Sequence, residues 1–288
     1  MWFAEGNPLT LAVFRAAFAL CLAAEVPSTR HMSVFAIEGG FHLPYLRLVP
    51  LLEPKLYAQV HLSQYFLILL LGLGVATRAA AGSLLFLQGW VFYADRMNFR
   101  NHPYFFLLVL AILLVSPCDD TLSLRAWLRG RRGLQAMLRP PHRPLTAQRL
   151  IQFQVVVVYV YAASMKIHPQ FLGGGIVALE ANRWLLGAAA TDDARVALSS
   201  TFDPTVWMAL SWGTIVLEGF LAVGLCWARA RPLAFALGIL FHLGLGLVMG
   251  VWTFSLGYLA TYLLFLDPET IPCAIERASR RRRAVEAA

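Results

Sequence analysis

Apolar runs long enough to cross a bilayer recur along most of the chain, with short polar stretches between them. A bilayer core about 30 Å thick needs about 20 predominantly apolar residues in a helix. On this criterion, spans are predicted near residues 8–26, 56–76, 79–94, 103–119, 148–168 and 205–227. The pattern is typical of an all-α, polytopic transmembrane helix bundle.

The last apolar run, residues 233–266, is too long for one crossing. It has 34 residues without a formal charge, and a helix rises about 1.5 Å per residue. Gly246 and Gly250 offer a break in it. We therefore expect two further spans and about eight in all, with a single kinked span plus a re-entrant piece as the alternative.

The distribution of basic residues predicts how the bundle is oriented. With eight spans, the two termini and the segments after the second, fourth and sixth spans share one side, which carries fifteen basic residues against seven on the other. The positive-inside rule then places both termini and residues 120–147 in the cytoplasm. The outer side receives the connections 27–55, 95–102 and 169–204. The interrupted apolar stretches of 27–55 and 169–204 are expected to form either an interfacial lid or surface helices without a role.

Composition narrows the class of protein further. The chain is 59% hydrophobic and 14% charged, whereas soluble domains carry about 25% charge, so no separate soluble domain is expected. The net charge of +8 comes mostly from arginines in the cytoplasmic segments, which argues against a nucleic-acid partner. We divide the chain into a transmembrane domain, 1–270, and a basic cytoplasmic tail, 271–288, whose RRRR run would bind anionic lipid.

Two further features concern processing and metals. The start, MWFAEGNPLT, has an acid but no base before the apolar run, which argues against a cleaved signal peptide. The four cysteines lie far apart without a CxxC or zinc spacing, so neither a metal site nor a disulfide framework is predicted.

Ionisable residues inside the predicted spans are costly and therefore candidates for function. They are Arg15, Glu25, His61, Lys166, Glu218 and His242. Lys166 ends the span VVVVYVYAASMK and is one of only two lysines in the chain. Partial desolvation favours the neutral amine, which can act as a base or nucleophile. The alternative is that Lys166 extends to the lipid headgroups.

A second polar cluster, YADRMNFRNHPYF at residues 93–105, precedes the fourth span on the same outer face as Lys166. His102, followed by Pro103, is expected at a helix start, where its ring can exchange protons while Arg96 and Arg100 hold an anion. The alternative is an ordinary polar turn. His242, in FHLGLG, either lines a pocket or is a hydrogen-bonded packing residue, because nearby glycines allow close approach of a ligand or a helix.

Several runs resemble the vitamin K-dependent gamma-carboxylases. QFQVVVVYVYAASMKIHPQFLGG, residues 152–174, is similar to the segment that carries the family's catalytic lysine, which falls on Lys166. RNHPYFFLLVLAILLVSPCDDTLSL, residues 100–124, resembles the Asn-His segment and places His102 on its functional histidine. LGLGVATRAAAG and FHLGLGLVMGVWTFSLGYLA resemble the flanking helices, so the resemblance covers roughly residues 10–270. The short bacterial members are grouped as the HTTM (horizontally transferred transmembrane) domain.

The resemblance implies an enzyme of a bacterial inner membrane that uses reduced vitamin K, of the menaquinol or phylloquinol type. Neutral Lys166 would deprotonate the quinol, and oxygen addition would yield an epoxide and a strong base. That base would remove a proton from a glutamate γ-carbon, which then takes up carbon dioxide with help from His102. An intramembrane pocket suits this chemistry because it is dry. Asn101, Arg100 and His242 would position quinone or substrate.

The sequence departs from the family pattern around Lys166. Ala163, Met165, His168 and Phe171 stand where the family has other residues, among them a glycine, an aspartate and a tryptophan. The carboxylases also continue into a large lumenal portion that docks the substrate polypeptide, whereas this chain stops at Ala288. The expected partners are membrane lipid and quinone, together with a peptide substrate or a separate soluble partner protein that supplies the missing portion.

Two hypotheses of different classes follow. The first is a quinone-dependent carboxylase-like membrane enzyme, favoured by the presence of both Lys166 and His102. The second is a non-enzymatic or accessory membrane protein for peptide or toxin maturation or for lipid binding. A transporter would predict two similar halves with broken helices, and no such symmetry is seen.

Overall fold

A helix lies at each of the eight positions where the apolar runs predict one. The computed structural model describes residues 3–29, 43, 45, 48–96, 99–130, 133–186 and 202–286. The helices at these positions are α1 (Leu9–Glu25), α3 (Pro54–Leu73), α4 (Thr77–Ala94), α5 (Asn101–Val115), α8 (Thr146–Met165), α12 (Pro204–Gly224), α13 (Arg231–Met249) and α14 (Trp252–Tyr262). The all-α class is thereby confirmed.

The number of membrane crossings is a separate question from the number of helices. Among the described residues, three helices are by themselves long and apolar enough to cross a membrane, namely α3, α12 and α13. Helix α5 is apolar but has only 15 residues, and α14 has only 11. The chain is a membrane protein, whereas eight crossings and cytoplasmic termini remain predictions.

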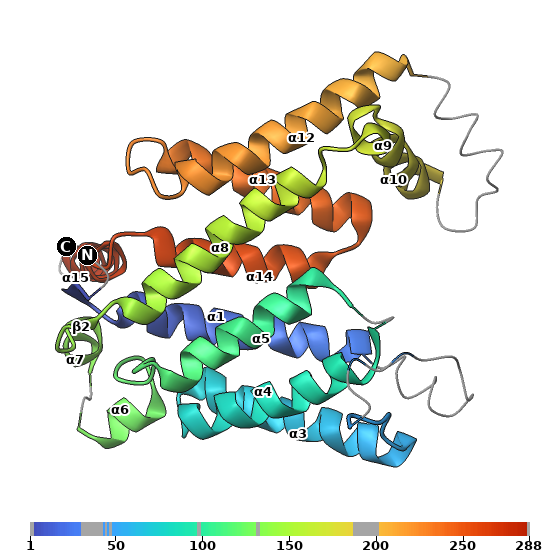
Figure 1. The fold of residues 1–288 in the computed structure, drawn as a ribbon. Helices are drawn as coiled ribbons and strands as arrows, with labels where there is room; N and C mark the ends of the chain where they lie inside the picture. The colour runs from blue at the N-terminus through green and yellow to red at the C-terminus, as the bar shows by residue number, and fades with distance from the viewer. Residues whose placement is uncertain are drawn as a thin grey trace. The chain divides into compact units, whose positions relative to one another are not determined.

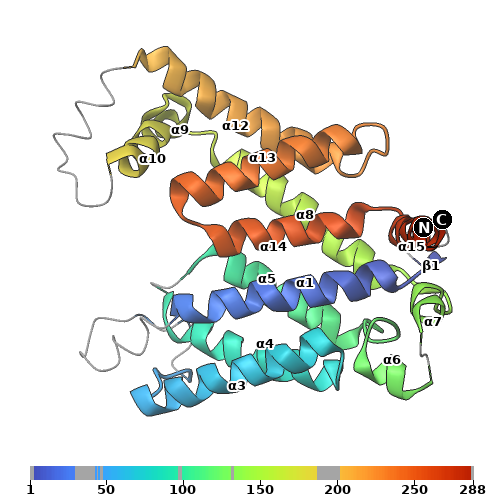
Figure 2. The ribbon, with the colours of Figure 1, turned by 180° about the vertical axis from the view of Figure 1, so that it is seen from behind.

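The chain divides into two compact units. Unit 1 comprises residues 1–151 and 266–288, and unit 2 comprises residues 152–265. In unit 1, helices α1, α3, α4 and α5 lie side by side (Figures 1 and 2). The core between α1 and α5 is aromatic: Phe18 stacks on Phe14 with ring centroids 5.6 Å apart and meets the edge of Phe106 at 5.3 Å. Burial of such large rings dominates core stability.

Arg15 of α1 is fully buried in unit 1 and ties together three chain segments. Its guanidinium donates hydrogen bonds to the carbonyls of Cys118 at 2.8 Å, Leu122 at 2.6 Å and Gly72 at 3.3 Å. These carbonyls lie near the end of α3 and in the connection after α5, where no helical N–H group reaches them. The charge of Arg15 is therefore used to satisfy backbone acceptors.

Short elements complete one end of unit 1. These are β1 (Glu5–Gly6), α6 (Leu124–Leu128), α7 (Leu134–Leu138), β2 (Arg143–Pro144) and α15 (Thr270–Glu286). Strands β1 and β2 pair antiparallel, with Glu5 opposite Pro144. The predicted basic tail is the helix α15, and its Glu276 accepts hydrogen bonds from Arg139 at 2.8 and 3.0 Å.

In unit 2, helix α13 packs against both α12 and α14. The predicted break in the long apolar run occurs at Gly250, which ends α13 with φ +68°, a conformation that glycine adopts without strain. Gly246 instead lies within α13. Gly238, His242 and Gly246 are spaced four residues apart and so share one face of α13. That face meets Tyr262, Tyr258 and Trp252 respectively, all from α14.

Two helices follow Lys166 in unit 2, α9 (Pro169–Leu172) and α10 (Gly175–Leu186), and both pack against α12. They show that the first half of the connection 169–204 is helical. The 3-10 helix η1 (Val26–Thr29) follows α1, and η3 (Leu263–Phe265) follows α14. Within the two predicted interfacial stretches, residues 30–42, 44, 46–47 and 187–201 lie outside the described residues.

Candidate functional site

Lys166 lies one residue beyond the end of α8, and its side chain turns toward α12. Its Nζ donates hydrogen bonds to both carboxylate oxygens of Glu218, at 2.7 Å and 2.6 Å, and to the carbonyl of Ala162 at 3.3 Å. The Lys166 side chain is 26% exposed and that of Glu218 is 6% exposed. This direction differs from that of a lysine reaching for lipid headgroups, which would leave the ammonium in water.

The surroundings of this ion pair are apolar on one side. The ring of Phe171, in α9, lies with its centroid 5.9 Å from Lys166 Nζ. A cation near an aromatic face is attracted by the ring quadrupole. The position just past a helix C-terminus favours a positive charge as well. Lys166 is therefore held by a carboxylate, a helix end and a ring, and it stays partly accessible.

The sequence marks Glu218 as an ionisable residue inside a predicted span but contains nothing that connects it to Lys166. The two residues are 52 positions apart on different helices, so no spacing in the sequence links them. One feature of the sequence could have indicated the pairing. Glu218 is the only acidic residue between Pro204 and Gly224, and an intramembrane charge needs a partner.

The second predicted residue, His102, also contacts a buried glutamate, in unit 1. Glu25 lies at the end of α1 and is 5% exposed. One of its carboxylate oxygens is 3.1 Å from His102 Nε2, and the other is 3.1 Å from Arg100 Nη2. Arg100 precedes α5 and His102 is its second residue, as the sequence predicted for a helix start. Glu25 thus holds the two side chains together.

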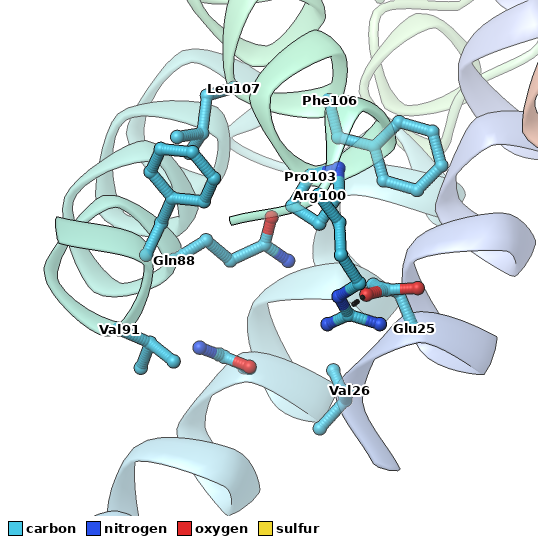
Figure 3. Close-up of a pocket in the computed structure, with 10 residues that line it drawn as sticks. Glu25, Val26, Gln88, Val91, Arg100, Pro103, Phe106 and Leu107 are labelled. Carbon is cyan, nitrogen blue, oxygen red and sulfur yellow. Dashed lines mark ion pairs between the residues drawn. The ribbon is translucent and has the colours of Figure 1, made fainter. Parts of the chain in front are cut away.

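A small cavity adjoins this cluster. It is lined by Glu25, Val26, Gln64, Gln88, Val91, Phe92, Arg100, Pro103, Phe106 and Leu107. Figure 3 shows Arg100 reaching Glu25, with the Gln88 side chain extending toward the same space. The cavity is partly open, and its volume of about 30 Å³ is room for one or two water-sized molecules.

The remaining predicted residues differ in their surroundings. Asn101, at the start of α5, is exposed. Arg96 lies over the ring of Tyr45, with its Cζ 5.2 Å from the centroid, whereas Arg100 binds Glu25. The two arginines therefore have different partners, and the structure does not bring them together around an anion.

His242 of α13 lies in an aromatic cluster of unit 2 and is fully buried. Its Nε2 is 2.7 Å from the hydroxyl of Tyr159, which is 2.8 Å from the hydroxyl of Tyr262. The ring stacks on Tyr258 at 5.6 Å between centroids. This geometry is that of a hydrogen-bonded packing residue, the alternative left open by the sequence.

The structure therefore brings Arg100 and His102 together on the Glu25 carboxylate and places Lys166 beside Glu218. The hypothesis that Lys166 and His102 serve one pocket involves both units and stays a prediction. The HTTM domain family matches residues 3–269 of the chain, nearly its whole length. No solved structure matches the chain.

Proposed function

Because the chain belongs to the HTTM domain family of membrane proteins, which is associated with vitamin K-dependent carboxylase, we propose that it is a quinol-dependent membrane enzyme of the carboxylase type. The observation that carries the proposal is the ion pair of Lys166 with Glu218. A lysine that is partly accessible, flanked by apolar surface and held by a buried carboxylate has the environment of a functional amine rather than of a membrane anchor.

The residues around Lys166 fit a reduced quinone better than the cavity in unit 1 does. The Lys166 side chain is a quarter exposed beside the Phe171 ring, so an aromatic ligand can contact both the ring and the amine. The cavity beside Arg100, at about 30 Å³, is too small for a fused quinone ring. When bound, a reduced quinone supplies, with oxygen, the strong base that carboxylation of a glutamate requires.

Lys166 acts as a base only as the neutral amine. Glu218 is its nearest proton acceptor, because both carboxylate oxygens lie within 2.7 Å of Nζ. A proton that moves from Nζ to Glu218 leaves a neutral amine beside a neutral carboxylic acid. Because charges are costly in a low-dielectric site, their removal offsets part of the free energy of this proton transfer. Lys166 then receives a hydroxyl proton from the ligand, while Glu218 keeps the amine in place.

His102 would act at the acceptor end of the reaction. Its Nε2 lies 3.1 Å from a carboxylate oxygen of Glu25, which fixes the orientation of the imidazole ring. Arg100, held on the same carboxylate, would orient a carboxylate or carbonyl of the substrate. In this proposal Asn101, exposed at the helix start, contacts the peptide substrate or a soluble partner.

Epoxide formation tests the proposal directly. The full-length protein, reconstituted with lipid, is given reduced menaquinone under oxygen, and the epoxide is measured by chromatography. We expect the wild type and the matched control Lys55→Met to form epoxide and Lys166→Met to form none. Epoxide from Lys166→Met would overturn the role of Lys166. A folded wild type that forms none would instead support the non-enzymatic accessory function.

A further inference from the structure

The short helix α6 of unit 1 carries an exposed apolar face. Leu124, Trp127 and Leu128 are three and four residues apart, so they share one face of the helix. Their exposed fractions are 43%, 42% and 64%. Ala126, on the other side of the helix, is buried at 2%. A contiguous apolar face outside the long helices indicates contact with a partner or with a membrane.

Several contacts hold α6 in this orientation. The Ser123 hydroxyl caps the helix by accepting a hydrogen bond from a backbone N–H of its first turn at 2.9 Å, and it donates one to the carbonyl of Asp119 at 2.6 Å. The Asp119 carboxylate binds Arg125. Leu122, just before the helix, has a left-handed φ of +45°, which costs free energy in a residue with a Cβ atom. Its carbonyl is held by Arg15 at 2.6 Å. The exposed face is therefore a fixed feature of the fold.

The depth of α6 in the membrane can be inferred from α3, which is long and apolar enough to cross it. The 20 residues of α3 span about 30 Å, the thickness of a hydrocarbon core, so Leu73 at its end lies at the lipid boundary. Gly74 follows and packs on Ser123, since a Cβ atom at Gly74 would lie 2.3 Å from the Cβ of Ser123. Helix α6 therefore begins where α3 leaves the hydrocarbon, at the same end of unit 1 as the turn between α3 and α4 (Figures 1 and 2).

The side chains around α6 are those that favour this depth. Tryptophan is enriched at membrane–water interfaces because its ring is apolar and its N–H is polar. Arg78, in the first turn of α4, and Arg129, at the end of α6, are exposed, and guanidinium groups bind phosphate well. Asp119 and Asp120 are each paired with an arginine, so neither leaves an uncompensated negative charge that would repel lipid phosphates.

We propose that α6 inserts into the interface of the surrounding bilayer, with Leu124, Trp127 and Leu128 at the boundary between headgroups and acyl chains and Arg129 on a lipid phosphate. Phospholipid is the occupant of this face because the face begins at the depth of the lipid boundary and combines apolar with cationic groups. The insertion fixes the depth of this end of unit 1 in the membrane. It does not depend on the quinol chemistry proposed above.

Fluorescence quenching of Trp127 tests the insertion. The full-length protein is placed in nanodiscs at one copy per disc, made of phosphatidylcholine that is unmodified, brominated on the acyl chain near the headgroup, or brominated deep in the chain. The emission of the wild type minus that of Trp127→Phe isolates Trp127. We expect the shallow bromines to remove most of this emission, the deep bromines to remove less, and acrylamide in the water to have little effect. Trp207→Phe is the matched control, because Trp207 is only 8% exposed and should be quenched less by the shallow bromines.

The quenching pattern also identifies other occupants of the face. Quenching by acrylamide without quenching by the bromines would place Trp127 in water, accessible to a soluble partner, and would overturn the proposal. Emission that neither quencher reaches would mean that the protein itself covers the face and would overturn it as well. Lipid quenching that disappears when two copies share a disc would assign the face to a second copy of the chain instead of to lipid.

A stability comparison at Leu128 gives a second test that does not use fluorescence. A polar substitution at a residue that is 64% exposed is nearly neutral where the side chain faces water. At the lipid boundary, Leu128→Gln places a carboxamide among acyl chains, whereas Leu128→Met keeps an apolar side chain of similar helix propensity. We expect a lower thermal midpoint for Leu128→Gln in lipid nanodiscs. Equal midpoints for the two variants would overturn the proposal, whatever the outcome of the epoxide assay.

Discussion

Gly238 of α13 faces Tyr262 so closely that a single methyl group there should disrupt the core of unit 2. A Cβ atom at this position would lie 2.7 Å from two carbons of the Tyr262 ring, whereas carbon atoms pack comfortably at about 3.5–4.0 Å. The ring would have to withdraw by about 1 Å. Its hydroxyl is hydrogen-bonded at 2.8 Å to Tyr159, which in turn bonds His242 at 2.7 Å, so the whole cluster would shift.

The expected cost of Gly238→Ala can be worked out from these contacts. Overpacking costs about 1–3 kcal/mol, and the loss of one buried hydrogen bond adds about 1 kcal/mol. The helix propensity of alanine returns up to about 1 kcal/mol. On the same helix, a Cβ atom added at Gly244 would have nothing within 4 Å, so Gly244→Ala should gain the propensity alone. The two variants should therefore differ by about 2–4 kcal/mol.

Thermal unfolding in detergent measures this difference. A gap of that size corresponds to roughly 3–7 °C in the midpoint for a chain of this length, with Gly238→Ala the less stable. Adding Tyr262→Phe to Gly238→Ala removes the atom nearest to the new methyl group and should recover part of the loss. Equal midpoints for Gly238→Ala and Gly244→Ala would refute the packing of α13 on α14 described above.

Three further predictions concern buried charges. Arg15→Leu should destabilise the protein by about 3 kcal/mol or more, measured by thermal unfolding, because three backbone carbonyls lose their donor. Burial raises the pKa of Asp119, but hydrogen bonds, chiefly from Arg125, bring it below its usual value. The Asp119 carboxylate therefore contributes fully to the stability of the folded protein above about pH 4, and this contribution is lost as the pH falls through the lowered pKa. Asp119→Asn should accordingly lose less stability than the wild type on acidification from pH 5 to about pH 2. In Glu218→Gln, an amine-selective reagent should modify Lys166 faster relative to the chain's other lysine, as read by mass spectrometry, since the amine is no longer held by two hydrogen bonds to the carboxylate; an unchanged ratio would contradict the pairing.

The positions of the long helices could be predicted because apolar runs and their polar breaks are local features of the sequence. The break after α13 could be located only to one of two glycines. Gly250 forms it because its φ of +68° is left-handed, whereas Gly246 faces the Trp252 ring within the helix. The choice depends on what each glycine packs against, which the sequence does not contain. The short β1–β2 ladder gave no signal, because a two-residue strand has no periodicity to detect.

The candidate site could be predicted in its members but not in its pairings. Lys166 and His102 stood out because each is an ionisable residue at the end of an apolar segment. Their partners, Glu218 and Glu25, are 52 and 77 residues away. A helical pattern indicates which face of a helix is apolar, but not which neighbouring helix covers that face. The ion pairs therefore required the structure.

The helix that follows Gly250 has a consequence for the lipid around the protein. Helix α14 and the 3-10 helix η3 run from Trp252 to Phe265, which at about 1.5–2 Å per residue spans roughly 21–24 Å. A segment of this length is shorter than a hydrocarbon core of about 30 Å, and local thinning of the bilayer accommodates such a mismatch when the segment crosses it. The thickness of the surrounding membrane then affects the stability of the packing of α13 on α14. Reconstitution in lipids of shorter acyl chains should stabilise this helix pair.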